Sequence, residues 1–183
     1  MIALYIFAGA WAIFIMVWKW WYETAPRIEA QRMARVALAS VIDGTIDSTA
    51  GTDVIDSAAY KRRNGIEWAV SFDIPAGENG KRIDFGLPQD GVGSNVRSFY
   101  LGTDEASGLN VVYYKDNNAA LHRIRPTLGM TDLKFEKYTD AGGSVYDDIV
   151  KVTATVDKTV TGTRQGDYAI EIKHSDTVFL NNV

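Results

Sequence analysis

The two histidines, His122 and His174, are the only side chains of this chain that ordinarily act as general bases near neutral pH. A hydrolytic triad needs such a histidine beside a nucleophile and an orienting acid, and no motif around either histidine supplies that arrangement. Both histidines fall within predicted strands. We therefore expect ordinary histidines, on the surface or on a sheet face, and no catalytic residue.

Motifs for cofactors and for transition metals are absent from the sequence. It has no cysteine and no H-E-x-x-H segment, and its Gly-Val-Gly at 91–93 lacks the strand–turn–helix context of a phosphate-binding loop. We expect no cofactor. Acidic loops remain candidates for calcium, which takes six to eight oxygen ligands. The weak candidate ligands are Asp140, Asp147 and Asp148, with a second set formed by Asp104, Glu105, Asp116 and Asn118. Neither set has EF-hand spacing, so solvated turns are the favoured interpretation.

The charge balance excludes one class of partner. The 183 residues include 19 Lys and Arg against 23 Asp and Glu, a formal net charge of −4. Binding to the phosphate backbone of nucleic acid requires clustered positive charge. The sequence therefore predicts no nucleic-acid partner.

The first 18 residues contain no charged side chain and predict a helix of membrane length. Such a helix is about 27 Å long, close to the roughly 30 Å of a bilayer's hydrocarbon core. A basic and aromatic belt suited to lipid headgroups follows at residues 19–22. A cleavable signal peptide is one alternative, but no basic residue precedes the run and residues 23–27 are a poor cleavage site. A buried core helix is the other, and an aromatic-rich segment that is apolar on all sides does not favour it.

Pro26 predicts a break directly after this belt. It cannot donate a backbone hydrogen bond and disfavours helical geometry at Ala25. We expect the helix to be kinked, frayed or restarted there, with Thr24 as the N-cap of the second part and Pro26 near its first position. Helix is then predicted from residue 27 to about residue 47.

The second helical part has one broad apolar face at 100° per residue. Its members are Ala30, Met33, Ala34, Ala37, Leu38, Val41 and Gly44. A narrower apolar stripe consists of Ile28, Ala39, Ile42 and Ile46. Two interpretations stay open: a single irregular core face, or one stripe on the chain's own head and the other on neighbouring chains.

The remainder of the chain alternates short apolar runs with turn signals, as antiparallel β-structure does. Strands are predicted at 66–74, 82–87, 97–101, 109–115, 119–125, 133–138, 149–157 and 167–180, the last with a bend. The period of two is clearest where Val150, Val152, Ala154 and Val156 alternate with polar residues. The predicted fold class is α+β, with a long N-terminal helix packed on an antiparallel sheet. Its parts are an apolar helix at 1–22, an amphipathic helix at 23–50 and a β-rich head at 51–183.

This layout resembles the type IV pilins and the pseudopilins of type II secretion, which share the apolar helix, the amphipathic continuation and the sheet. Residues 118–157 are similar to a stretch of the larger minor pilins and pseudopilins. There a strand ends in an arginine, and a Phe-x-x-Tyr-like strand, a glycine turn and a Val/Thr strand follow. The end of the chain is similar to their closing Leu-Arg-Asn; Leu180 and Asn182 fit that pattern and Asn181 departs from it.

Two features depart from that family. No basic leader ending in glycine is visible, so the resemblance implies that Met1 is the residue exposed by a prepilin peptidase and a site of N-methylation, unless the chain is an uncleaved anchor. Tyr5 stands where the family usually has a glutamate that pairs with a neighbour's terminal amine. A bare ammonium in an apolar core is costly, so we expect it near water or headgroups, or satisfied by a carbonyl or the Tyr5 hydroxyl.

The resemblance implies a non-enzymatic subunit of an extracellular filament, held in the membrane before assembly and extracted by a separate ATPase machine. Its partners would be identical subunits, the membrane and the pilus or secretion assembly machinery. The residues expected in the filament core are Ile2, Leu4, Tyr5, Ile6, Phe7, Trp11, Ile13, Phe14, Val17 and Trp18. The alternatives are a minor pilin or pseudopilin, or a single-span anchored β-domain that binds a partner without polymerising; an anchored hydrolase is the least supported.

Overall fold

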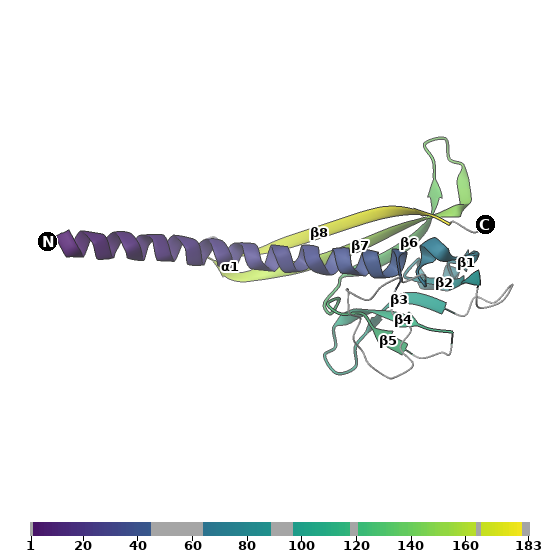
Figure 1. Ribbon diagram of the computed structural model, residues 1–183, viewed down its shortest axis with the longest axis horizontal. Coiled ribbons are helices and arrows are strands. Elements are labelled where there is room, and N and C mark those ends of the chain that lie inside the picture. The colour runs from purple at the N-terminus through teal and green to yellow at the C-terminus, as the bar shows by residue number, and fades with distance from the viewer. Residues whose placement is uncertain (1, 45–63, 89–96, 118–120, 164–165, 181–183) are drawn as a thin grey trace.

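The fold is α+β, with one long N-terminal helix and two antiparallel sheets that form no closed barrel. The computed structural model describes residues 2–44, 64–88, 97–117, 121–163 and 166–180. Figure 1 shows the helix as a rod whose N-terminal half extends away from a head at the opposite end. The predicted fold class is therefore confirmed.

Helix α1 spans Ile2–Ile42 without interruption, with Pro26 inside it. The predicted restart at Pro26 and the predicted N-cap at Thr24 were wrong. The Thr24 hydroxyl instead donates to the carbonyl oxygen of Trp20, one turn earlier, at 2.5 Å. A proline inside a helix costs about 3 kcal/mol, and the downstream half is held in helical form by the face that it buries in the head.

Helix α1 ends at Ile42, about five residues before the predicted end at residue 47. The Asp43 amide still bonds to the carbonyl oxygen of Ala39, and Gly44 then turns the chain with a φ of +105°. Such a positive φ is easily adopted by glycine and is the usual way to end a helix. Ile46 and the rest of the predicted extension to residue 50 lie outside the described residues.

The first sheet has five strands in the order β1-β2-β3-β4-β5, each antiparallel to its neighbour. Its strands are β1 (Ser71–Asp73), β2 (Arg82–Gly86), β3 (Arg97–Thr103), β4 (Asn110–Lys115) and β5 (Leu121–Arg123). The strand predicted at 66–74 is only partly present, because a 3₁₀ turn, η1 (Ile66–Trp68), replaces its first half. The 3₁₀ period of three lets both Ile66 and Ala69 be fully buried, whereas a strand would point them to opposite faces. A second 3₁₀ turn, η2 (Ala76–Glu78), precedes β2.

The second sheet has the order β6-β7-β8 and is dominated by one long hairpin. Its strands are β6 (Asp132–Thr139), β7 (Val145–Thr163) and β8 (Gly166–Phe179). Strand β7 extends well beyond the predicted 149–157, since Val160 continues the buried alternation, and β8 is one strand in the structure. The β7–β8 ladder runs from Ile149 opposite Phe179 to Val160 opposite Tyr168, with a register shift beyond Val160.

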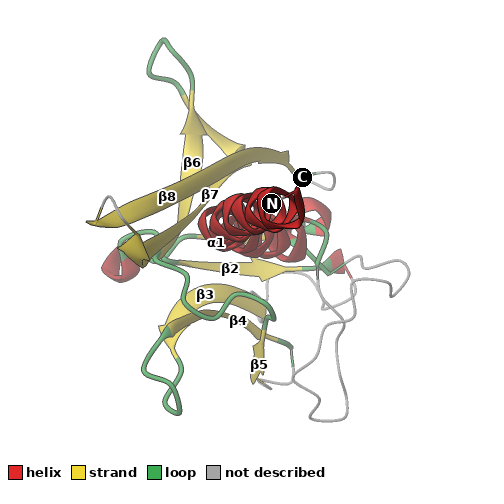
Figure 2. Cartoon of the chain, turned by 90° about the vertical axis from the view of Figure 1, so that its left-hand side faces the viewer, coloured by secondary structure: helices red, strands yellow, loops and turns green. Residues whose placement is uncertain are grey.

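The core lies where α1 meets the two sheets (Figure 2). The helix contacts β7 and β8, and the first sheet contacts β6 through β2 and β3. A cross-strand row of rings fills the first sheet, with centroids 5.5 Å apart for Phe85 and Phe99 and 5.0 Å apart for Phe99 and Tyr114. The prediction that the second half of the helix covers the sheet is confirmed.

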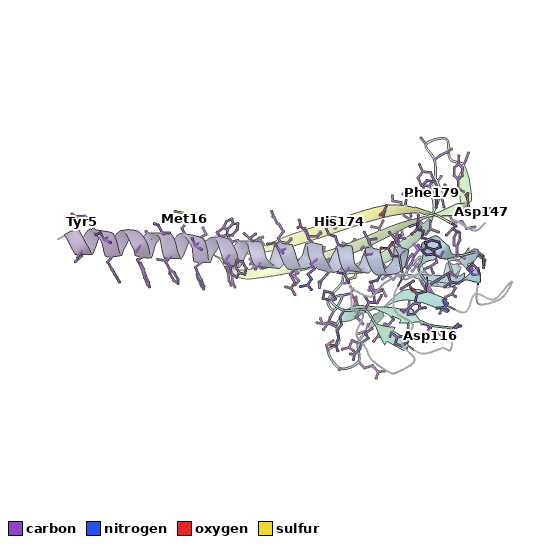
Figure 3. The ribbon with its side chains drawn as sticks, viewed as in Figure 1. Tyr5, Met16, Asp116, Asp147, His174 and Phe179 are labelled. Carbon is purple, nitrogen blue, oxygen red and sulfur yellow. The ribbon has the colours of Figure 1, made fainter. Side chains whose placement is uncertain are left out.

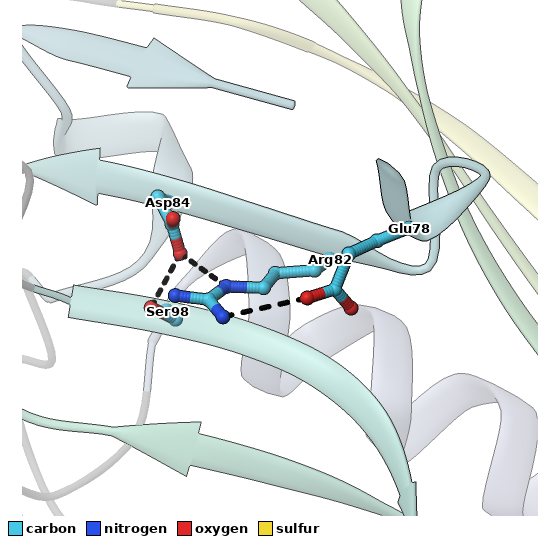
Figure 4. A network of polar contacts seen from close by, with 4 residues as sticks. All are labelled: Glu78, Arg82, Asp84 and Ser98. Carbon is cyan, nitrogen blue, oxygen red and sulfur yellow. Dashed lines mark hydrogen bonds and ion pairs between the residues drawn. The ribbon is translucent and has the colours of Figure 1, made fainter. Parts of the chain in front are cut away.

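A polar network joins β2 to β3 and to the turn before β2 (Figure 4). Asp84 accepts hydrogen bonds from Arg82 Nε at 2.7 Å and from the Ser98 hydroxyl at 2.5 Å, and Arg82 also pairs with Glu78 at 3.5 Å. The hydrogen bond that Arg82 donates to Asp84 is the main cause of a raised pKa for Arg82. These side chains satisfy one another's hydrogen-bonding groups across neighbouring strands. Their role in the described structure is to hold β2 against β3.

Candidate membrane and assembly surface

The N-terminal half of α1 is exposed on every side. All residues from 3 to 22 are exposed, with 75% of Tyr5 and 62% of Trp18 accessible. Figure 3 shows the side chains of this half projecting from the rod, with Tyr5 and Met16 labelled. A helix that is apolar all round needs an apolar environment, and this one finds none among the described residues of its own chain.

The length of the exposed half fits a bilayer. Residues 2–18 have a rise of about 26 Å at 1.5 Å per residue, against roughly 30 Å of hydrocarbon. The helix is long and apolar enough to cross a membrane. The expected filament-core side chains from Leu4 to Trp18 all lie on this exposed half; Met1 and the side chain of Ile2 lie outside the described part.

The expected basic and aromatic belt encircles the helix directly above this segment. Trp20 and Trp21 are each 62% exposed, and the rings of Trp18 and Tyr22 stack with centroids 5.9 Å apart. Lys19 pairs with Glu23 one turn later at 3.7 Å. Trp, Tyr and Lys side chains prefer the membrane–water interface, where their apolar parts contact lipid and their polar ends contact water.

The head begins directly above this belt, where the far end of the β7–β8 hairpin meets α1. The Tyr168 hydroxyl contacts the carbonyl oxygen of Glu23 at 3.4 Å, and Lys158 forms an ion pair with Glu29 at 2.6 Å. Residues 23–26 are half-buried, and Ala30 is fully buried. We did not predict these hairpin contacts; the only signal was the Val/Thr alternation that continues past residue 157.

The broad apolar face of the helix is buried, as predicted. Its residues Ala30, Met33, Ala34, Ala37, Leu38 and Val41 are each at most 9% exposed. Of the narrower stripe, Ile42 packs against the core, whereas Ile28 is 54% exposed and Ala39 is also exposed. Most of the described part of that stripe therefore lies outside the head's own core.

Both histidines lie on strands, as expected, and they are separated in the fold between the two sheets. His122, on β5, is 5% exposed, its Nε2 lies 3.4 Å from Asp116 Oδ2, and its ring is 6.1 Å from that of Tyr114. Of the two positions expected for it, His122 occupies the sheet face, where it packs at the end of the aromatic row. His174 lies on β8, and its buried Nε2 has no hydrogen-bond partner among the described residues.

Two of the three candidate calcium ligands, Asp140 and Asp147, are engaged with the protein itself. Asp140 Oδ1 accepts the amides of Gly142 at 2.8 Å and Ser144 at 2.9 Å, and its Oδ2 accepts the Tyr146 hydroxyl. The bond from Ser144 is the main cause of a lowered Asp140 pKa. Asp147 pairs with Lys137 at 2.5 Å. Within the described ranges, no group of three or more His, Cys, Asp or Glu residues is arranged to hold a metal.

The described members of the second acidic set form no metal-binding cluster either. Asp104 accepts the Arg123 guanidinium at 2.7 Å and the Ser107 hydroxyl at 2.7 Å, and the Ser107 bonds are the first cause of its lowered pKa. Asp116 faces His122, as described above, and Asn118 lies outside the described residues. Asp104 and Asp140 therefore stabilise the turns in which they lie.

No protein-family model, curated protein or solved structure matches this chain. The function must therefore be argued from the molecule itself. It consists of an apolar helix of membrane length, an interfacial belt and an α+β head built on the same helix, an architecture compatible with that of pilins.

Proposed function

We propose that this chain is a structural subunit of a pilin-like helical filament, anchored in a membrane by the first half of α1 before assembly. The observation that carries the proposal is that one continuous helix has two halves with different surroundings. One half is packed into the head, and residues 3–22 are left bare. Lipid covers the bare half in the membrane, and the same half of neighbouring subunits covers it in the polymer.

Small residues in the exposed half of α1 favour its association with the same half of a neighbouring subunit. Ala8 and Ala12 are four residues apart and lie on one side of the helix, with Gly9 beside Ala8. Small residues at this spacing let the backbones of apolar helices approach closely. An added Cβ on Gly9 meets no atom of the described chain within 4 Å, so that side is open to a neighbour.

The geometry of the subunit suits an open polymer. The subunit has its head at one end and its bare helical surface at the other. This shape favours contacts in which the bare helix of one subunit packs beside a different part of the next subunit along the fibre. Such heterologous contacts produce helical fibres when they do not close into a ring. Assembly machinery driven by an ATPase would lift each subunit out of the bilayer, and the filament would then be exposed at the cell surface.

The proposal is tested by shearing cells that express the chain and imaging the released material. We expect filaments from the unaltered protein and none from Ala12→Asp, because a carboxylate at the centre of an apolar helix costs about 2.5–3.5 kcal/mol. The variant Ala12→Leu stays apolar and remains in the membrane fraction, but its larger side chain should also reduce filament yield. The matched control Ala141→Asp places the same charge on an exposed turn and should assemble normally.

Two results would overturn the proposal. The first is a filament yield from both Ala12 variants equal to that of the unaltered chain. The second is an empty sheared fraction with all of the unaltered chain recovered as a detergent-soluble monomer, which is the behaviour of an anchored β-domain that does not polymerise.

A further inference from the structure

A pocket of about 310 Å³ opens at the foot of the head, where α1 emerges from it. Glu23, Thr24 and Arg27 line it from the helix, and Tyr168 lines it from the end of the β7–β8 hairpin. The pocket directly follows the belt formed by residues 19–22. When residues 2–18 lie in hydrocarbon, the membrane-side end of the pocket, at Glu23, therefore falls at the level of the lipid headgroups.

The charges in this pocket are of both signs and differ in how they are satisfied. The Arg27 residue is exposed and forms no hydrogen bond or ion pair with any of the described residues. Glu23 has Lys19 at 3.7 Å, an exposed pair that is worth little in water. The pocket thus presents an available guanidinium and, beside it, a carboxylate that is only weakly engaged.

The geometry of a helix brings both groups towards the membrane. Cα–Cβ bonds tilt towards the helix N-terminus, which here is the membrane side. Along the axis, Glu23 lies about 6 Å and Arg27 about 12 Å beyond Lys19 at 1.5 Å per residue. The headgroup layer is roughly 5–8 Å thick on each side of the bilayer. An arginine side chain is long enough to span the one helical turn, about 6 Å, between Arg27 and the level of Glu23, which would bring the guanidinium within reach of that layer.

We propose that this pocket binds the headgroup of a phosphoethanolamine lipid, with Arg27 on the phosphate and Glu23 on the ammonium group. A guanidinium matches phosphate oxygens in a two-pronged hydrogen-bonded arrangement. The carboxylate of Glu23 repels a purely anionic headgroup and accepts hydrogen bonds from a primary ammonium. A trimethylammonium group carries the same charge but has no N–H to donate, so a choline headgroup fits less well.

This inference rests on the anchored state within the proposed function and adds a role for the foot of the head. A bound headgroup would fix the height and orientation of the head on the bilayer while the subunit waits for assembly. Extraction into the polymer would then release one lipid from each subunit. Tyr168 has a positioning role, since its contact with Glu23 holds the hairpin end against the helix.

Native mass spectrometry of the full chain in dodecylmaltoside, a detergent without phosphate, tests the proposal. Equal amounts of phosphatidylethanolamine, phosphatidylcholine, phosphatidylglycerol and a galactosyl diacylglycerol are added. We expect one retained lipid, chiefly phosphatidylethanolamine, and about tenfold weaker retention in Arg27→Gln because a charged hydrogen bond is lost. Glu23→Gln should remove the preference for ethanolamine over choline. Inorganic phosphate alone should not displace the lipid.

The matched control is Arg32→Gln, which removes an exposed arginine of the same helix outside the pocket and should retain the lipid fully. Circular dichroism of each variant verifies that it remains folded. Equal retention of all four lipids, unchanged retention in Arg27→Gln, or displacement by inorganic phosphate would overturn the inference. These results leave the shearing experiment unaffected, and absent filaments in that experiment leave headgroup binding intact, so the two proposals fail separately.

Discussion

Two glycines allow the C-terminal end of α1 to meet the chain that returns to it. Gly44 has a φ of +105°, and a Cβ placed on Gly65 would overlap the carbonyl oxygen of Ile42 and the amide nitrogen of Gly44. The obstructing atoms are backbone atoms, which cannot move aside by a change of rotamer. The junction between the helix and the head therefore requires glycine, which has no side chain, at positions 44 and 65.

We predict that Gly65→Ala destabilises the head by about 1–3 kcal/mol, the usual cost of forcing extra atoms into a packed site. Thermal unfolding followed by circular dichroism measures the effect as a lower Tm. Gly77→Ala is the control, because a Cβ on Gly77 meets nothing within 4 Å. Equal Tm values for the two variants would show that the junction can relax without cost.

At the scale of elements, α1 and the β7–β8 hairpin support each other over the same stretch. The hairpin contacts the helix from Glu23 to the buried face around Val41, through Tyr168, Lys158 and the apolar alternation of β7. This packing explains why Pro26 lies inside an unbroken helix. Local backbone preference disfavours helix there, and the burial of an adjacent amphipathic face outweighs it.

We predict that Pro26→Ala stabilises the head, by up to about 3 kcal/mol, because alanine restores a backbone N–H and removes the ring from the helix interior. The measurement is the Tm of the full chain in detergent, compared with that of the unaltered protein. A lower Tm in Pro26→Ala would contradict this expectation and would mean that the proline ring makes a packing contribution larger than its backbone cost.

At the scale of the whole molecule, the rod divides into two parts with little structural dependence on each other. The most apolar window of the helix contributes nothing to the core, whereas the face from Ala30 to Val41 is almost completely enclosed. The chain's charged residues all lie from Lys19 onward, beyond the apolar run. The molecule therefore combines a head that has its own core with an apolar segment that the described part of its own chain leaves uncovered.

We predict that a chain starting at Glu23 is a soluble monomer whose stability differs from that of the full chain by no more than about 0.5 kcal/mol, the usual effect of changes at exposed positions. Size-exclusion chromatography gives its oligomeric state, and circular dichroism gives its unfolding curve. Aggregation or loss of the fold in this truncated chain would show that residues 3–22 take part in the core after all.

Local patterns were enough to predict much of this architecture. The charge-free run, the buried face from Ala30 to Val41 and the alternation from Val150 to Val156 all follow from hydrophobic periodicity, which depends on neighbours along the chain. The same patterns predicted which half of the helix covers the sheet. Burial of the face from Ala30 to Val41 and of the alternating residues from Val150 to Val156 confirms two of those predictions, and the charge-free run forms the exposed N-terminal half of α1.

Tertiary structure alone decided the features that depend on distant parts of the chain. The sequence determined an apolar helix, an amphipathic continuation and a β-rich head, because periods of 3.6 and 2 are local properties. Helix continuity through Pro26, the burial of His122 and the pocket that Arg27 shares with Tyr168 were decided by packing between elements far apart in sequence. Energies of packing can exceed local backbone preferences, and no local pattern records which surfaces will meet.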